Sequence, residues 1–192
     1  MKSINKKIVY EYTIEKSRFI SVIYRVNSKE EIDKYLTDIR KEYKEATHYC
    51  YAYKLDTIRK SSDDGEPGGT AGVPMMEVLN SMDLDYILVI VIRYFGGIKL
   101  GAGGLVRAYR KALVDAFTNN KEYIVNLIDG YEIEIETSYD KQKEIDNTFN
   151  NIINKEYKET VKYIINITKE EYELYKERFN IKIIKDIKIE TK

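Results

Sequence analysis

Glycine is confined almost entirely to one stretch of this 192-residue chain. Nine of the 10 glycines and both prolines lie between residues 65 and 104, and only Gly130 lies elsewhere. Glycine is used where the backbone takes a positive φ or where another group approaches it closely. A flexible linker would also be rich in serine, and this stretch is not. The pattern therefore predicts specialised loops within a folded domain.

Regular elements are expected on both sides of these loops. Runs of β-branched and aromatic residues predict strands at 8–14, 19–26, 47–55 and 86–92. The last of these is apolar enough to be buried on both faces. Ser28 and Glu31 form a capping-box pattern, which predicts a helix to about residue 43. Further helices are expected from Pro74, placed at a first helical position, and over 105–117.

The composition changes after residue 130, since no glycine or proline follows. Apolar periodicity there predicts, in order, a strand at 131–138, a helix at 140–153, two strands within 156–167, a helix at 169–179 and a strand at 181–189. This β-α-β-β-α-β order is the ferredoxin-like arrangement. The sequence therefore predicts an α+β protein with two domains, residues 1–128 and residues 129–192.

The net charge of zero hides an uneven distribution along the chain. Residues 1–126 hold 20 basic and 17 acidic side chains, and residues 127–192 hold 12 and 15. Within 93–111 there are five cations and no acid. A uniformly basic nucleic-acid coat and an acidic tail protein are excluded, but a local basic patch is predicted.

The second glycine segment, 96–104, has the composition of an anion-binding loop. Backbone N–H groups at the start of a helix attract anions, and the nearby cations would favour phosphate. The segment lacks the GK[ST] of a Walker loop and the third glycine of a Rossmann fingerprint. A tight strand-to-helix turn remains the equal alternative. The candidate phosphate- or nucleic-acid-binding residues are Arg93, Gly96, Gly97, Lys99, Gly101, Gly103, Gly104, Arg107 and Arg110.

The first glycine segment, 61–72, holds three carboxylates: Asp63, Asp64 and Glu66. They could hold Mg²⁺ or act as an acid/base pair, although their spacing does not match an EF-hand. An acidic turn that pairs with the basic loop is the favoured interpretation, and we expect no metal or cofactor.

His48, the only histidine, shares a predicted strand face with Cys50. Residues two apart on a strand rarely form a His–Cys catalytic pair, so a partly buried structural histidine is expected. Tyrosines at 49, 51 and 53 could stack on bases from the opposite face, but tyrosine recurs throughout the chain and covers core edges more often.

Several features indicate a cytoplasmic location. The single cysteine rules out an intramolecular disulfide and a cysteine-based zinc site, which fits a reducing compartment. No apolar stretch follows the basic N-terminal residues, so no signal peptide is expected. The longest apolar run, 86–92, is far shorter than the roughly 20 residues that span a bilayer, so no membrane partner is expected.

Four segments together resemble the YigZ/IMPACT family, in particular its bacterial two-domain YigZ-type members. They are Ser17-Arg18-Phe19-Ile20, the His48-x-Cys50 strand, the acidic glycine segment 62–74 and the segment from Arg93 to Tyr109. The last of these is the most specific. The resemblance covers the whole first domain and, more weakly, the second.

The resemblance implies a fold for each domain. The first would be similar to the second domain of ribosomal protein S5, and the second to the ferredoxin-like fifth domain of elongation factor G. Eukaryotic relatives regulate translational stress signalling by protein contacts through an additional N-terminal domain, an activity that we do not expect here. For bacterial members the resemblance implies nucleic-acid or ribosome binding and no established reaction.

Three functional hypotheses follow. The first is a translation-associated regulatory protein that contacts RNA or the ribosome through the basic glycine-rich loop. The second is an enzyme that acts on a small phosphorylated or nucleotide substrate between the two glycine segments. The third is a regulator that binds only proteins. Converging carboxylates in a deep pocket would favour the enzyme, and an open basic face would favour the RNA-binding protein.

Overall fold

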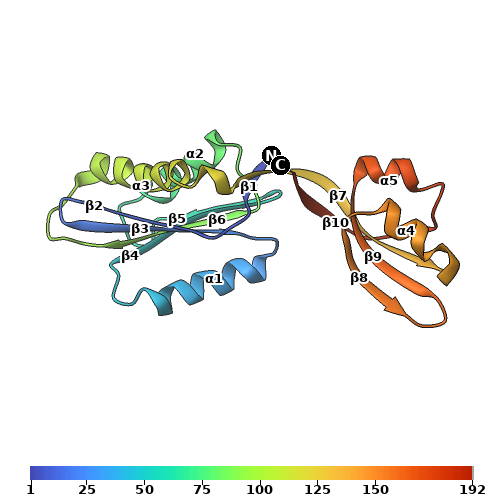
Figure 1. Cartoon of the computed structure of the whole chain (residues 1–192). Helices are drawn as coiled ribbons and strands as arrows, with labels where there is room; N and C mark the ends of the chain where they lie inside the picture. The colour runs from blue at the N-terminus through green and yellow to red at the C-terminus, as the bar shows by residue number, and fades with distance from the viewer. Residues whose placement is uncertain (192) are drawn as a thin grey trace. The chain divides into compact units, whose positions relative to one another are not determined.

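The computed structural model describes residues 1–191 and divides the chain into two compact units, Met1–Val125 and Asn126–Lys192. Each unit combines an antiparallel sheet with helices, as the α+β prediction required (Figure 1). The division lies inside strand β7 (Ile124–Thr137) and not in a loop. Within residues 1–191, no helix is both long and apolar enough to cross a bilayer.

The first unit is built on a five-stranded sheet in the order β2-β3-β6-β4-β5. Its strands are β2 (Ile8–Ile14), β3 (Ser17–Arg25), β4 (His48–Leu55), β5 (Ile58–Ser62) and β6 (Ile87–Tyr94), and the short β1 (Lys2–Ile4) bridges to Leu84. The central strand β6 is buried over seven consecutive residues. The predicted strand with two buried faces is thereby confirmed.

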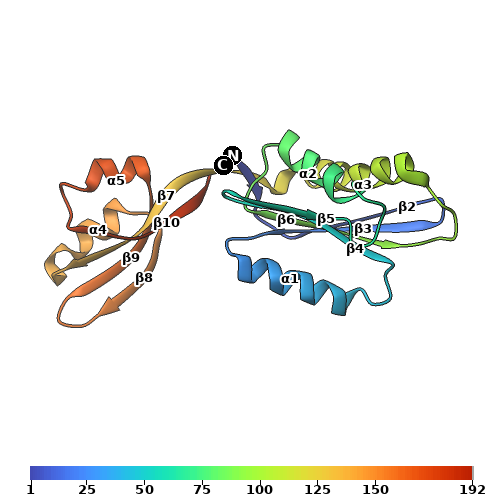
Figure 2. The same cartoon turned by 180° about the vertical axis from the view of Figure 1, so that it is seen from behind.

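Helices cover both faces of this sheet. Helix α1 (Lys29–Glu42) lies on one face, and α2 (Gly72–Ser81) and α3 (Gly101–Thr118) lie on the other (Figures 1 and 2). Alternate residues of β6 therefore belong to two cores: Val89 and Val91 pack with α2 and α3, and Leu88 and Ile90 pack with α1. The tyrosines of β4 pack against the α1 side, which confirms their role at the edge of a core.

Several elements in the first unit differ from prediction. Strand β5 was not expected, because it is polar and forms only by pairing with β4. Helix α2 begins at Gly72, so Pro74 is its third residue and not its first. Helix α3 begins at Gly101, within the segment predicted as loop. Glycine is suited to this position because Gly101 has a φ of +69°, a left-handed conformation that glycine adopts without strain.

The second unit has the predicted ferredoxin-like order. Strand β7 pairs with β10 (Ile181–Thr191) on one side and β9 (Val161–Thr168) on the other, and β8 (Ile152–Tyr157) pairs with β9. All of these pairings are antiparallel. Helices α4 (Gln142–Thr148) and α5 (Lys169–Tyr175) complete the unit around a core that includes Ile145, Phe149 and Tyr163.

The sequence extended one helix of this unit too far. The helix predicted over 140–153 ends at Thr148, because Ile152 pairs with Ile165 and begins β8. A 3₁₀ turn, η2 (Tyr139–Lys141), precedes α4, and another, η1 (Lys121–Tyr123), precedes β7. Gly130 lies within β7, where a Cβ would approach Ile189 Cδ1 to 2.4 Å. Its role is close packing, and it does not mark a linker.

Candidate functional site

The strand register brings three side chains of the first unit to one point on the sheet. Arg93, near the end of β6, is paired with Phe19 of β3 and with His48 of β4. Cross-strand partners project from the same face of a sheet. Phe19 belongs to the core under α2 and α3, so Arg93 and His48 are directed to that side as well.

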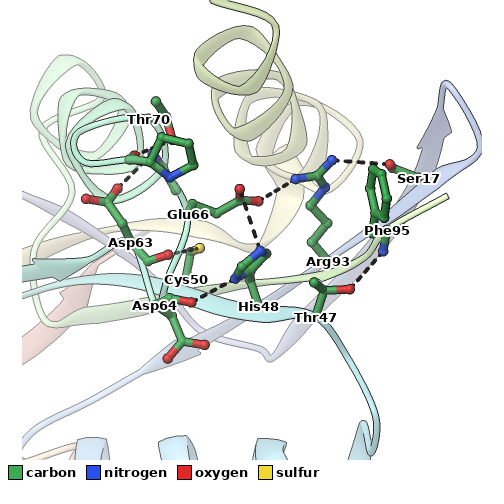
Figure 3. Close-up of polar contacts among 12 residues, drawn as sticks. Ser17, Thr47, His48, Cys50, Asp63, Asp64, Glu66, Thr70, Arg93 and Phe95 are labelled. Atoms are coloured by element: carbon green, nitrogen blue, oxygen red, sulfur yellow. Dashed lines mark hydrogen bonds and ion pairs between the residues drawn. The ribbon is translucent and has the colours of Figure 1, made fainter. Parts of the chain in front are cut away.

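Glu66 lies at the centre of this cluster (Figure 3). Its side chain is 3% exposed, and Oε1 accepts hydrogen bonds from Arg93 Nη1 at 2.7 Å and Tyr109 Oη at 2.8 Å. Burial, followed by the neighbouring Cys50 and Glu66, holds the pKa of the Tyr109 hydroxyl well above its usual range. The hydroxyl therefore stays protonated and donates to the carboxylate. We call Glu66, Arg93, His48 and Tyr109 the Glu66 cluster.

Arg93 is buried but not fully satisfied. Its Nη2 donates to Ser17 Oγ at 3.4 Å, and the same oxygen accepts the Gly96 N–H at 3.2 Å. Its Nε is buried without a hydrogen-bond partner among the described residues. A buried donor without a partner costs about 1–3 kcal/mol, so this atom is a point where a ligand or water can add a hydrogen bond.

His48 is held in one orientation by the acidic turn. Its Nδ1 lies 2.8 Å from the Asp64 carbonyl oxygen, which can only accept, so Nδ1 carries the proton in neutral His48. The other nitrogen, Nε2, then has a free lone pair and lies 3.7 Å from Glu66 Oε2. The ring is 18% exposed, as the partly buried interpretation predicted.

The remaining two carboxylates of the acidic segment accept hydrogen bonds from backbone N–H groups. Asp63 accepts N–H groups from Gly69, Ala71 and Gly72 at 2.8–2.9 Å and so shapes the start of α2. Asp64 contacts Arg40 at 2.6 Å and accepts the N–H of Tyr49 at 2.7 Å. Only Glu66 meets the basic segment. Within residues 1–191, no group of three or more His, Cys, Asp or Glu side chains is arranged to hold a metal ion.

The three N–H donors make Asp63 a source of pH-dependent stability. Burial alone raises the pKa of its carboxyl, but the backbone hydrogen bonds outweigh burial and lower it. A lowered pKa in the folded state means that the stabilisation is fully present above the unfolded pKa of about 3.9 and is lost as pH falls through the folded value. We expect Asp63→Asn to lower the free energy of unfolding by about 1–2 kcal/mol at neutral pH, and less at low pH.

Urea unfolding at a series of pH values measures this difference. Asp33→Asn is the control, because the Asp33 carboxylate is exposed on α1 and pairs with Lys29. That substitution should change the free energy of unfolding by less than about 1 kcal/mol. A stability loss for Asp63→Asn that stayed constant from neutral pH to well below pH 4 would contradict the assignment.

A pocket of about 400 Å³ opens beside the Glu66 cluster. Its polar lining includes His48, Glu66, Arg93 and Lys99, and the start of α3 forms another part of the lining. A second hollow of about 650 Å³ lies between the first half of α3 and the turn that joins β2 to β3. It is lined by Lys99, Arg107 and Lys111, with Glu15 as its one acidic side chain.

The structure separates the nine predicted binding residues into different environments. Arg93 is buried in the ion pair with Glu66, and Arg110 pairs with Glu77 on α2. Lys99 and Arg107 make no ion pair with any residue in 1–191. Gly101, Gly103 and Gly104 form the first turn of α3, which no side chain caps. Gly96 and Gly97 precede it in the connection from β6.

Sequence reasoning missed two members of this arrangement. Tyr109 lies on α3 and bonds Glu66, and Ser17 bonds both Arg93 and Gly96. Tyr109 could have been found from its position, because it lies between Leu105 and Ala112 on the side of the predicted helix that carries small residues. Cys50 donates to the Asp63 carbonyl oxygen at 2.9 Å, and burial raises its pKa to about 12. It is therefore a structural thiol and not a nucleophile.

Comparison with known proteins gives the family. The family model described as Impact N-terminal domain matches residues 15–117, more than half of the chain. The chain belongs to the Impact N-terminal domain family. The resemblance to the YigZ/IMPACT family is thereby confirmed.

Curated relatives share this Impact N-terminal domain. IMPACT family member YvyE of Bacillus subtilis is 50% identical over 113 residues, which cover 57% of this chain and 52% of the relative. IMPACT family member YigZ of Escherichia coli is 42% identical over 101 residues, half of each protein. The chain spans about half the length of these relatives. A crystal structure titled as that of a hypothetical protein matches with a TM-score of 0.65 at 25% identity and covers 96% of this chain and 97% of its own.

The matched residues include the whole Glu66 cluster. Ser17, His48, the acidic segment and α3 up to Phe117 all lie within the Impact N-terminal domain, and the second unit lies outside it. The candidate site is therefore a feature of the Impact domain and not of the ferredoxin-like unit.

Proposed function

We propose that this chain is a translation-associated regulatory protein that contacts RNA or the ribosome through the basic surface at the first half of α3. The surface consists of Lys99, Arg107 and Lys111, which we call the basic α3 surface. The observation that supports it most is their gathering around one open hollow with a single acidic side chain, Glu15.

The charges on this surface are available to a ligand in different degrees. Lys99 and Arg107 have no ion-pair partner in residues 1–191, whereas Lys111 is paired with Asp115. The first N–H groups of α3 lie beside Lys99, and the helix dipole adds partial positive charge there. Such an open arrangement suits phosphate groups along a chain and does not read bases.

The family resemblance supports a translational context for this contact. It implies a first domain similar to the second domain of ribosomal protein S5 and a second domain similar to the fifth domain of elongation factor G, and both units of the structure are α+β folds. The enzymatic alternative required carboxylates converging in one pocket. Since Asp63 and Asp64 are bonded to backbone groups, Glu66 alone lines the pocket.

Removal of the two unpaired cations tests the proposal. We expect Lys99→Ala/Arg107→Ala to weaken binding to structured RNA or ribosomes by about 10-fold or more at low salt. The slope of log K against log[salt] should become shallower by about 2, one unit for each lost phosphate contact. A salt-titrated binding assay with the full chain measures both quantities.

The matched control is Arg59→Ala/Lys60→Ala on β5. It removes the same two positive side-chain types from an exposed strand of the same unit, away from α3. Equal losses in the two double variants would show only a general charge effect and would overturn the assigned surface. Partners that co-purify from lysate and survive nuclease treatment would support the protein-binding alternative instead.

A further inference from the structure

The pocket beside the Glu66 cluster shares Lys99 with the basic α3 surface but suits a different kind of ligand. Its volume of about 400 Å³ lies within the range of small-molecule sites, roughly 300–1,000 Å³. It lies between the two glycine segments, because Glu66 and Pro67 line one side and residues 99–102 line the other. A folded RNA cannot enter a space of this size, but a small ligand can.

The charges that line the pocket favour an anion. Arg93 and Lys99 contribute two positive charges, and Glu66 contributes one negative charge that is already bonded to Arg93 and Tyr109. Gly101 and Ala102 add the first N–H groups of the 18-residue helix α3, which no side chain caps. The pocket therefore has a positive charge in excess and free donors for a phosphate oxygen.

Two polar atoms of the cluster are left for a ligand. Arg93, nine-tenths buried, lines the pocket with its Nε unpartnered among the described residues. His48 also lines it, and its Nε2 lone pair can accept a hydroxyl or N–H donor because Nδ1 donates to Asp64. The unpartnered Arg93 Nε and the His48 Nε2 lone pair are independent of the helix start, and they supply one donor and one acceptor for a ligand.

The other walls are apolar. Leu100, Leu105 and Pro67 line the pocket, and the Phe95 side chain, which also lines it, is 45% exposed. An exposed aromatic ring next to a phosphate site offers a stacking surface for a planar group. A bare inorganic anion would leave these walls in contact with water.

We propose that this pocket binds a nucleoside monophosphate or a phosphate ester of the same size. The phosphate lies at Lys99 and the start of α3, a ribose hydroxyl or base N–H donates to His48 Nε2, and the base packs against Phe95. The proposal does not depend on RNA binding by the basic α3 surface.

The single histidine makes a direct test possible. His48 is the only histidine of the chain, so the ring carbon–proton signals of its imidazole are unambiguous in a spectrum of the full protein. The probes are adenosine monophosphate, adenosine and inorganic phosphate, each titrated separately. We expect adenosine monophosphate to shift the His48 signals saturably, with a dissociation constant below about 1 mM, and the other two to bind about 10-fold more weakly.

One substitution fills the pocket without changing charge. Ala102 lines the pocket in the first turn of α3, and leucine is a good helix former, so Ala102→Leu should fold normally. We expect it to weaken adenosine monophosphate by about 10-fold, and Phe95→Ala to weaken it by about 5-fold. The Arg59→Ala/Lys60→Ala variant should retain the affinity of the parent chain. Thermal unfolding of each variant verifies its fold.

Each result decides the proposal in one direction. Saturable shifts that Ala102→Leu weakens and the β5 variant does not would support it. The absence of a saturable His48 shift with adenosine monophosphate up to about 10 mM would overturn it. Undiminished affinity in folded Ala102→Leu, or equal affinity for inorganic phosphate and adenosine monophosphate, would also overturn it. No titration contains RNA, so the outcome is independent of the test of the basic α3 surface.

Discussion

Glu66→Gln is expected to lower the free energy of unfolding of the first unit by about 3 kcal/mol or more. The substitution keeps the size of the side chain but removes its charge, so the buried Arg93 guanidinium loses the carboxylate 2.7 Å away. Tyr109 also loses a charged acceptor. A buried charge left without its partner is among the largest costs of a single substitution. Urea unfolding monitored on the full chain measures the change.

Glu77→Gln supplies the matched control. Glu77 also pairs with an arginine, Arg110, but both side chains are about half exposed. An exposed pair contributes about 1 kcal/mol or less, so this variant should remain close to the parent chain. If the two substitutions had similar effects, burial of the Glu66–Arg93 pair would not be the source of its stabilisation.

A companion double variant separates the ion pair from general packing. In Glu66→Met/Arg93→Met both charges are removed together, and apolar side chains of similar length replace them. Because the desolvation cost of both ions disappears, we expect the double variant to be less destabilised than Glu66→Gln alone. Such recovery would assign the large single-variant effect to the unpaired guanidinium.

Gly96→Ala should destabilise the first unit by about 2–4 kcal/mol. A Cβ at this position would lie 2.0 Å from the carbonyl carbon and oxygen of Lys16 and 2.5 Å from the Ser17 nitrogen. These are backbone atoms at the β2–β3 turn, so no side-chain rotation relieves the overlap. The Gly96 N–H also donates to Ser17 Oγ, and moving residue 96 away from the β2–β3 turn would break that hydrogen bond.

Gly68→Ala is the control for Gly96→Ala. A Cβ on Gly68 would meet nothing within 4 Å, and its φ is not in the left-handed region. The loss of backbone freedom in the unfolded chain makes this change neutral or stabilising by about 0.5 kcal/mol. Equal thermal stability of the two variants would contradict the close approach of Gly96 to Lys16. Because Ser17 also bonds Arg93, the Gly96 variant should weaken ligand binding at the pocket too.

The fold followed from the sequence wherever one pattern dominated. The continuous apolar run of β6 and the capping box of α1 each allowed a single interpretation, and both elements formed as expected. The end of α4 did not allow a single interpretation, since Ile152 and Ile153 fit either a helix or a strand that pairs with β9. Strand β5 has no apolar pattern of its own, because its hydrogen bonds to β4 are what define it.

The site was predictable as a meeting of two segments but not in its details. Opposite charges in the two glycine segments indicated a pairing, and Glu66 meets Arg93. Which of the three carboxylates does so depends on the turn, where Asp63 accepts backbone N–H groups from residues six to nine positions later. The pairing of Arg93 with His48 depends on strand register. Neither the turn hydrogen bonds nor the strand register produces a periodic pattern in the sequence.

The shared strand β6 makes the two hydrophobic cores of the first unit cooperative. Its residues alternate between the core under α1 and the core under α2 and α3, so loss of β6 from the sheet would open both cores. Arg93 lies at the end of this strand, and its position is therefore fixed from both faces of the sheet. Separation of β6 from its neighbours would therefore displace Arg93 together with both cores.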